Sequence, residues 1–337
     1  MDPTPLEAPL VRPPVPRPRP RAATRNLTGD ALRLVFVGQA TYFACCALAD
    51  ECPWIESSFV DFRAGDDPRR MVETVRRRLP HIVIVFKPEV VPVGAFADLE
   101  AITVGYLTEP LPRRASGDHP DLERRLVDLR RLDATNFDRL ISFDPLMAPT
   151  IETIAPVWRS VPLPVADRYF RPVRPVFGRS HAIFLGRSTH HRESFLLGPK
   201  HRFDITHIAH GVGADELDAI ADSYDVGINL HNEPYPTFEN RVAIHLAAAQ
   251  LVLSEPLSPT HGLEPGLDYV QIETPTQLQR CLTEIFDVPD MYLRVRTRGR
   301  QKAEMFRASR VYPRLVADVL RDVDTFGRRN DAVSSTR

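Results

Sequence analysis

The chain lacks the features of a membrane protein, a disulfide-stapled protein or a nucleic-acid binder. No apolar run approaches the roughly 18 residues that span a bilayer, and the amino terminus has no charged-then-apolar signal pattern. The four cysteines show no Cys-x-x-Cys spacing, which disfavours a disulfide framework. The formal net charge is −1, so the overall charge gives no support for nucleic-acid binding. We expect a cytoplasmic protein without a transmembrane segment and without a nucleic-acid partner.

Two common catalytic fingerprints are also missing. No Gly-x-Ser-x-Gly elbow occurs, so a Ser-His-Asp hydrolase has no support. The stretch His210 to Glu216 carries Gly211-x-Gly213, but Glu216 occupies the third glycine position of a dinucleotide fingerprint. Asp215 and Glu216 would put negative charge where a pyrophosphate should sit, and Asp215 is interpreted as a helix N-cap. This loop could still contact a base or a ribose, but a nicotinamide-dependent oxidoreductase is disfavoured.

Proline, by contrast, is abundant and marks boundaries along the chain. Residues 1–30 combine many prolines with arginines, a composition that cannot bury a core, so we expect a disordered tail. A second proline-rich stretch, residues 162–175, is interpreted as a linker. The length of 337 residues fits two domains of about 150 residues each. We predict lobes at 31–165 and 176–311, followed by a last helix within 312–330.

Short apolar runs alternate with helical patterns in both halves, which predicts an α/β fold with two Rossmann-like lobes facing a cleft. The predicted strands cover residues 32–38, 58–62, 81–86, 102–107, 140–143, 182–186, 205–209, 226–230, 251–253 and 269–272. Ligands of such folds lie at the carboxyl ends of the strands. In the first half, Gly38 and Gln39 follow a strand, and Glu89, Glu109 and Asp144 are candidate general bases between which the spacing does not choose.

The loop after the strand at 182–186 is a candidate phosphate site. Gly186 lets the backbone approach a ligand, and Arg187 offers a planar fork to phosphate oxygens. His190, His191 and Arg192 make the loop locally cationic. A metal site and a plain surface turn are the alternatives, but adjacent histidines point apart and only Glu193 follows as a further ligand type.

The segment from Pro236 to Ser254 carries the most information. Small polar residues lead into an alanine-rich helical pattern and then a short apolar strand. A helix N-terminus offers unpaired N–H groups and a partial positive charge, which together form an anion site. Glu239 suits that position, whereas Arg241 runs against the helix dipole, so we interpret it as functional. We expect the helix to pack on the sheet through Ala247, Ala248 and Ala249.

Taken together, these motifs make the second half resemble a known family. They are Phe184-Leu-Gly-Arg187, Gly211 with Asp215-Glu-Leu, Tyr224 to His231, Asn240 to Ala249, and Leu263-Glu-Pro-Gly266 before Tyr269-Val. Their order and spacing resemble the C-terminal domain of GT-B glycosyltransferases, group 1, and most closely the CgeB-like (spore maturation protein-like) branch. The resemblance covers about residues 182–320. The first half matches only as a generic Rossmann-like lobe.

The resemblance implies metal-independent transfer of a sugar from a nucleotide diphosphate donor, with no cofactor, to an unknown glycan, protein or small-molecule acceptor. It also implies that the last helix crosses back to the first lobe, which would bind the acceptor. We assign catalytic roles to Arg187 and Glu239. The candidate substrate-binding residues are Gly38, Gln39, Gly186, His191, Arg192, His210, Gly211, Glu233, Thr237, Phe238, Asn240 and Arg241.

One position departs from the family pattern. Ile244 stands where the family commonly has a Glu that contacts the donor ribose, and Ala249 stands where it has Gly. Glu239 or Glu233 could substitute for that carboxylate. The departure keeps a second reading open, namely a non-catalytic GT-B-like protein that binds a nucleotide or a glycan, or acts as a scaffold.

Overall fold

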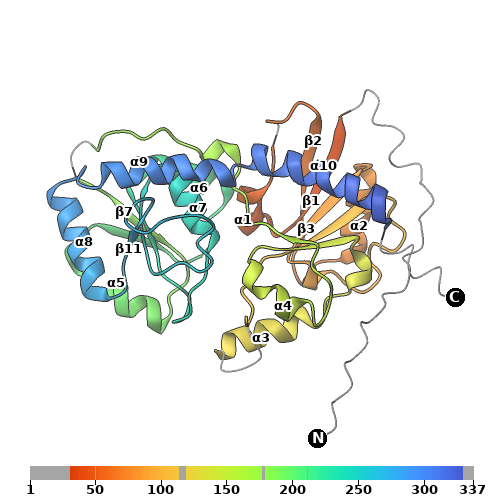
Figure 1. The fold of residues 1–337 in the computed structure, drawn as a ribbon, viewed down its shortest axis with the longest axis horizontal. Coiled ribbons are helices and arrows are strands. Elements are labelled where there is room, and N and C mark those ends of the chain that lie inside the picture. Colours follow the sequence, from red (N-terminus) through yellow and green to blue (C-terminus); the bar gives the residue numbers. More distant parts are fainter. Residues whose placement is uncertain (1–30, 50, 114–118, 177–178, 211, 329–337) are drawn as a thin grey trace, which may run out of the picture.

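The computed structural model describes residues 31–49, 51–113, 119–176, 179–210 and 212–328. The predicted disordered tail, residues 1–30, and the candidate Gly211 lie outside the described residues. Within the described part, the chain forms two parallel β-sheets with helices on their faces (Figure 1). None of the described helices is long and apolar enough to cross a membrane.

The first lobe is built on a sheet with strand order β2-β1-β3-β4-β5-β6. Its strands are β1 (Leu32–Gly38), β2 (Ile55–Asp61), β3 (Ile82–Phe86), β4 (Ile102–Leu107), β5 (Arg139–Ser142) and β6 (Arg159–Ser160). Its helices are α1 (Ala40–Phe43), α2 (Pro68–Arg77), α3 (Pro120–Leu129) and α4 (Ala148–Ile151). All five residues of β3 are buried, as expected for a central parallel strand covered on both faces.

The second lobe is built on a sheet with strand order β11-β10-β9-β7-β8. Its strands are β7 (Ala182–Leu185), β8 (Ile205–Ile208), β9 (Val226–Asn229), β10 (Leu251–Ser254) and β11 (Val270–Gln271). Its helices are α5 (His190–Arg202), α6 (Ala214–Ser223), α7 (Asn240–Ala247), α8 (Pro275–Asp287) and α9 (Leu293–Lys302). The carboxyl ends of β7 and β9 lie side by side, because these two strands pair in parallel register.

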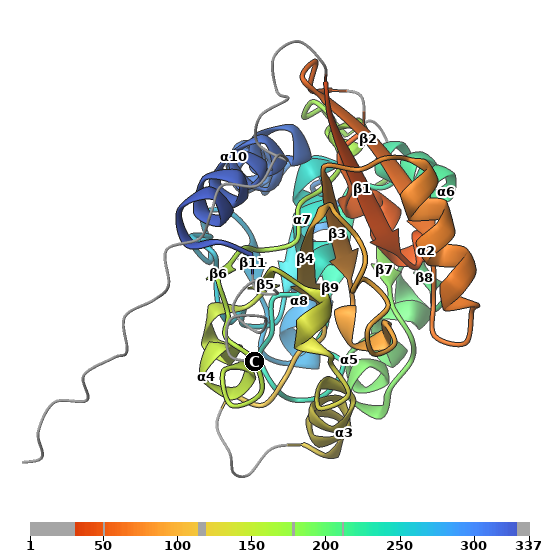
Figure 2. The same cartoon turned by 90° about the vertical axis from the view of Figure 1, so that its right-hand side faces the viewer.

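The last helix, α10 (Ala308–Phe326), returns to the first lobe as expected from the resemblance. It covers the face of the first sheet opposite to α2 (Figure 2). Tyr312 packs edge-on against Phe36, 4.8 Å between ring centroids, and its hydroxyl donates to the Cys46 carbonyl oxygen at 2.6 Å. Asp318 pairs with Arg159 of the edge strand β6, and Asp322 pairs with Arg139 of the neighbouring β5.

The chain crosses between the lobes twice, and the two crossings are bonded to each other. The Val165 amide donates to the Phe306 carbonyl oxygen at 2.7 Å, and the Ala308 amide donates to the Val165 carbonyl oxygen at 2.9 Å. Val165 and Arg307 thus form a parallel bridge. The outgoing and returning segments therefore meet between the lobes.

The segment after β1 forms a short helix, Ala40–Phe43, followed by a 3-10 turn, Ala44–Cys46. Two local predictions need correction. The helix after β8 starts at Ala214 with Gly213 as N-cap, and Glu216 accepts a hydrogen bond from the Gly213 amide, so Asp215 lies in the first turn. The helix α7 ends at Ala247, and Ala249 adopts a left-handed φ of 57°, so only Ala247 of the three alanines belongs to the helix.

Candidate functional site

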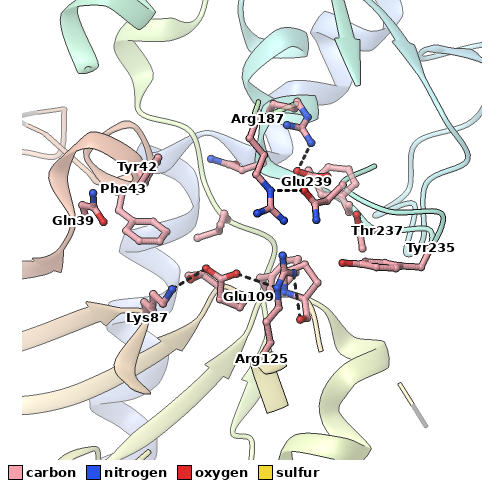
Figure 3. Close-up of a pocket in the computed structure, with 18 of the residues that line it drawn as sticks. Gln39, Tyr42, Phe43, Lys87, Glu109, Arg125, Arg187, Tyr235, Thr237 and Glu239 are labelled. Carbon is pink, nitrogen blue, oxygen red and sulfur yellow. Dashed lines mark hydrogen bonds and ion pairs between the residues drawn. The ribbon is translucent and has the colours of Figure 1, made fainter. Parts of the chain in front are cut away.

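A cavity of about 380 Å³ lies between the lobes, at the carboxyl ends of both sheets (Figure 3). This volume falls within the range of small-molecule sites. The second-lobe wall is formed by Arg187, Arg192, Asn232, Tyr235, Thr237, Phe238, Glu239, Asn240 and Arg241. The first-lobe wall is formed by Gln39, Tyr42, Phe43, Lys87, Thr108, Glu109, Pro110, Arg125 and Phe143, with Leu163 from the first crossing.

The helix α7 is pressed tightly against the second sheet, which fixes its amino terminus at the cavity. A Cβ added to Gly227 of β9 would lie 2.3 Å from the ring Cγ of His245. Only glycine permits this approach. Burial lowers the pKa of His245 to about 4, and its Nδ1 lies 2.6 Å from Gln250 Oε1. The N-cap residue of α7, Glu239, makes no side-chain capping bond.

Glu239 is instead held by two arginines behind the cavity surface. Its carboxylate lies 3.1 Å from Arg192 Nη2 and in direct contact with Arg241. Burial alone would raise the pKa of Glu239, but the Arg241 and Arg192 guanidinium groups outweigh it and the pKa is lowered. Burial lowers the pKa of Arg192 to about 10, with a further contribution from Arg241. Glu239 and Arg192 therefore both stay ionised at neutral pH.

Backbone carbonyl groups at the strand ends fix the same two arginines. Arg241 donates to Asn229 Oδ1 at 2.8 Å and to the Leu185 carbonyl oxygen at 2.6 Å. Arg192 donates to the Leu230 carbonyl oxygen at 3.1 Å. Each guanidinium thus joins helix, strand end and carboxylate, and multiple bonds of this kind preorganise a site.

Gly186 makes room for these guanidinium groups. Its φ is 150°, and a Cβ at this position would lie 2.8 Å from Arg241 Nη1 and 3.2 Å from Arg192 Nη1. The space beside the glycine is therefore occupied by two cationic side chains of the protein itself. Glycine is needed here for side-chain packing, whether or not a ligand approaches the loop.

Arg187 is less constrained than its two neighbours. Its side chain is about half exposed, and Nε donates to Asn232 Oδ1 at 2.9 Å. Across the cavity mouth, Asp121 of the first lobe lies 3.9 Å from Arg187 and accepts from the Tyr235 hydroxyl at 3.0 Å. These contacts bridge the two lobes. Burial alone would raise the pKa of Asp121, but Arg124 and Arg125 lower it overall.

The first-lobe wall carries a second carboxylate between two cations. Glu109 Oε1 lies 3.3 Å from Lys87 Nζ, and Glu109 Oε2 lies 3.6 Å from Arg125 Nε. Lys87 follows β3, Glu109 lies just beyond β4, and Arg125 belongs to α3. The sequence did not distinguish Glu89, Glu109 and Asp144 as candidate general bases. Of these three carboxylates, only Glu109 lines the cavity. Asp144 is buried and pairs with Arg113 at 2.8 Å, and burial raises the pKa of Glu89 to about 7.

The structure thus brings many of the predicted site residues to one cavity. Gln39, Arg187, Arg192, Thr237, Phe238, Glu239, Asn240 and Arg241 line it. Gly38, Gly186, His191, His210 and Glu233 do not belong to the lining. His191 lies 2.8 Å from Glu255, and Glu233 lies 3.6 Å from His119, so both are engaged elsewhere. Ile244 is buried in the hydrophobic core, and no metal-binding group of three or more side chains occurs among the described residues.

Several lining residues were not predicted. Tyr42 and Phe43 lie in α1, and Arg125 lies one turn into α3 beyond Asp121. Lys87 follows β3 and Glu109 lies two residues beyond β4, and both line the cavity, as the strand-end rule predicts. Arg125 has no such signal in sequence, since its position depends on how α3 lies against the second lobe.

Comparison with known proteins extends to structures only. No protein-family profile and no curated protein sequence matches the chain. Anabaena HepE in complex with UDP-glucose is similar over 86% of this chain and 100% of HepE, at 9% identity and a TM-score of 0.57. Sucrose-phosphate synthase from Thermosynechococcus elongatus is similar over 86% of this chain and 100% of its own, at 11% identity and a TM-score of 0.54. A UDP-forming α,α-trehalose-phosphate synthase from Burkholderia xenovorans matches 86% of this chain and 98% of its own, at 10% identity and 0.50. The chain therefore has the GT-B glycosyltransferase fold.

Proposed function

We propose that the chain is a glycosyltransferase that moves a sugar from a nucleotide diphosphate donor to an acceptor, in the manner of the CgeB-like group 1 enzymes. The observation that carries this proposal is the placement of Arg187 and the start of α7 on one wall of one interlobe cavity. The structural neighbours crystallised with UDP or UDP-glucose support the choice of donor class. Placement of residues 186–187 and 237–241 on opposite sides of the molecule would have contradicted it.

The proposed reaction breaks the bond between the anomeric carbon and the diphosphate oxygen and forms a bond from that carbon to an acceptor hydroxyl oxygen. The hydroxyl proton is released, and the nucleotide diphosphate leaves with an added negative charge. Arg187 and the first-turn amides of α7 would stabilise that charge. The positive charge thus comes from the protein, without a bound metal ion.

The proposed role of Glu239 is positioning. Its carboxylate holds Arg192 and Arg241 in place, and these guanidinium groups supply the fixed field near the donor. Glu239 and Glu233 are the two carboxylates that could replace the Glu that the family has at the position of Ile244. Only Glu239 lines the cavity.

Arg187→Ala tests the donor site. Loss of charge-assisted hydrogen bonds of about 1.5–3 kcal/mol predicts a rise in the Kd for UDP-glucose of roughly 10- to 100-fold. Isothermal titration calorimetry measures this change, preceded by a thermal-shift screen of nucleotide sugars to choose the donor. Arg76→Ala, an exposed arginine on α2 outside the cavity, is the matched control. Equal affinities of wild type and Arg187→Ala would remove Arg187 from the site.

The second candidate function is a non-catalytic binding protein with the same fold. The burial of Ile244 favours it, because no carboxylate stands at that position of α7. Turnover separates the two functions. Release of nucleotide diphosphate from the bound donor identifies an enzyme, whereas donor binding without release identifies the non-catalytic protein.

A further inference from the structure

The first-lobe wall has features that donor binding on the second lobe does not use. Lys87, the residue that follows β3, adopts the left-handed conformation with φ 56° and ψ 59°. For a residue with a Cβ this conformation costs roughly 1–2 kcal/mol, and such costs cluster at functional sites. The Lys87 amide donates to the Tyr106 carbonyl oxygen at 3.1 Å, and the side chain extends into the cavity (Figure 3).

The ion pair between Lys87 and Glu109 does little for the fold. Its two side chains are 39% and 34% exposed, and pairs of this exposure stabilise proteins only weakly. A strained backbone beside a weakly stabilising pair is unexplained by folding alone. The pair does place an N–H donor and a carboxylate acceptor 3.3 Å apart, facing the second-lobe wall of the cavity. Two neighbouring hydroxyl groups of one ligand can bind such a pair, one as acceptor and one as donor.

Aromatic side chains line the same wall of the cavity as this pair. Tyr42 is 53% exposed, and Phe43 is fixed by stacking on Phe86 at 5.0 Å between ring centroids. Gln39, which precedes them at the end of β1, adds an amide to the same wall. A flat apolar surface beside paired polar groups suits a ligand with one C–H face and several hydroxyls.

We propose that the acceptor is a sugar, and that Lys87 and Glu109 hold two neighbouring hydroxyls of its ring while Tyr42 covers one ring face. This inference rests on the proposed glycosyl transfer and adds the acceptor class and the residues that select it. The cavity is enclosed between two lobes bridged by Asp121 and Tyr235, which favours a compact acceptor over an extended peptide.

The test uses the full chain, the donor chosen by the thermal-shift screen, and three kinds of acceptor. These are a panel of mono- and disaccharides, p-nitrophenol, and a peptide that contains Ser and Tyr. Acceptor-stimulated release of nucleotide diphosphate is measured, and mass spectrometry identifies the product. A sugar is expected to stimulate release and to appear glycosylated. Donor hydrolysis without stimulation by any sugar, or stimulation only by a non-sugar, overturns the inference and leaves the proposed function intact.

Glu109→Gln and Lys87→Met then test the assigned residues. Each is expected to raise the KM for the sugar at least 10-fold, because a hydroxyl loses a charged partner, while the KM for the donor changes less than twofold. Glu73→Gln, which removes an exposed ion pair of α2 with Arg77, is the control and should change neither. Unchanged acceptor KM in both cavity variants overturns the assignment. Failure to bind any nucleotide sugar would overturn the proposed function, and this inference with it.

Discussion

The two walls of the cavity place a carboxylate between cations in different ways. On the second lobe, Glu239 lies between arginines that are 3% and 10% exposed and are bonded to strand-end carbonyl groups. On the first lobe, Glu109 lies between cations that are 39% and 13% exposed. Buried, multiply bonded charges hold one geometry, whereas partly solvated ones can rearrange. The second wall therefore holds its charges in one geometry, and the charges of the first wall can rearrange.

The largest expected contrast is in stability. Arg241→Met would leave Glu239 with one buried partner and remove the bond to the Leu185 carbonyl oxygen, so we expect a loss of about 3 kcal/mol in the free energy of unfolding. Lys87→Met should cost less than about 1 kcal/mol. Urea unfolding of both variants measures the difference. Equal losses would show that the two walls are equally rigid.

A second contrast concerns pH. Burial lowers the pKa of His245 to about 4, below the ordinary value of 6.5. As the pH falls, His245 is therefore protonated in the unfolded chain before it is protonated in the folded chain. Stability is thus unaffected above about pH 6.5 and falls as the pH drops from about 6.5 to 4, by roughly 2–3 kcal/mol. Buried His231, whose pKa burial also lowers, acts in the same direction. His245→Gln should flatten this part of the pH profile in urea unfolding. A profile as steep as that of wild type would contradict the role of His245.

The smallest expected effect lies at the end of α7. Ala249 adopts φ of 57°, a conformation that glycine reaches at little cost. Ala249→Gly should therefore stabilise the chain by about 0.5–1 kcal/mol, visible as a higher urea midpoint with an unchanged m-value. Ala248→Gly, one residue earlier with φ of −69°, is the control and should not stabilise. A destabilised Ala249→Gly variant would mean that packing of the methyl group outweighs the backbone strain.

The sequence supported prediction of the fold because its signals are local. Apolar runs ending at Gly38 or Gly186 and the Pro236–Ser254 pattern each act over a few residues, so the strands and α7 could be located. Parallel packing then puts the carboxyl ends of the strands at one edge of each sheet. This much was enough to bring Arg187 and residues 237–241 to one wall.

The remainder of the site depends on long-range contacts that no local pattern encodes. Arg192 and Glu239 are 47 positions apart and Asp121 and Tyr235 are 114 apart. Arg241 was interpreted as a functional residue because it opposes the helix dipole. In the structure Arg241 also donates to Asn229 and to Leu185, so it has a structural role as well. These two partners come together only when the strand ends pack side by side. The left-handed backbone of Lys87 likewise follows no residue rule, since glycine would be the expected choice.

The bridge between Val165 and Arg307 restricts how the lobes can move. Because the Val165 amide donates to Phe306 and the Val165 carbonyl oxygen accepts from Ala308, neither connection can shift at this point without moving the other. The two walls of the cavity are thus linked through both connections together.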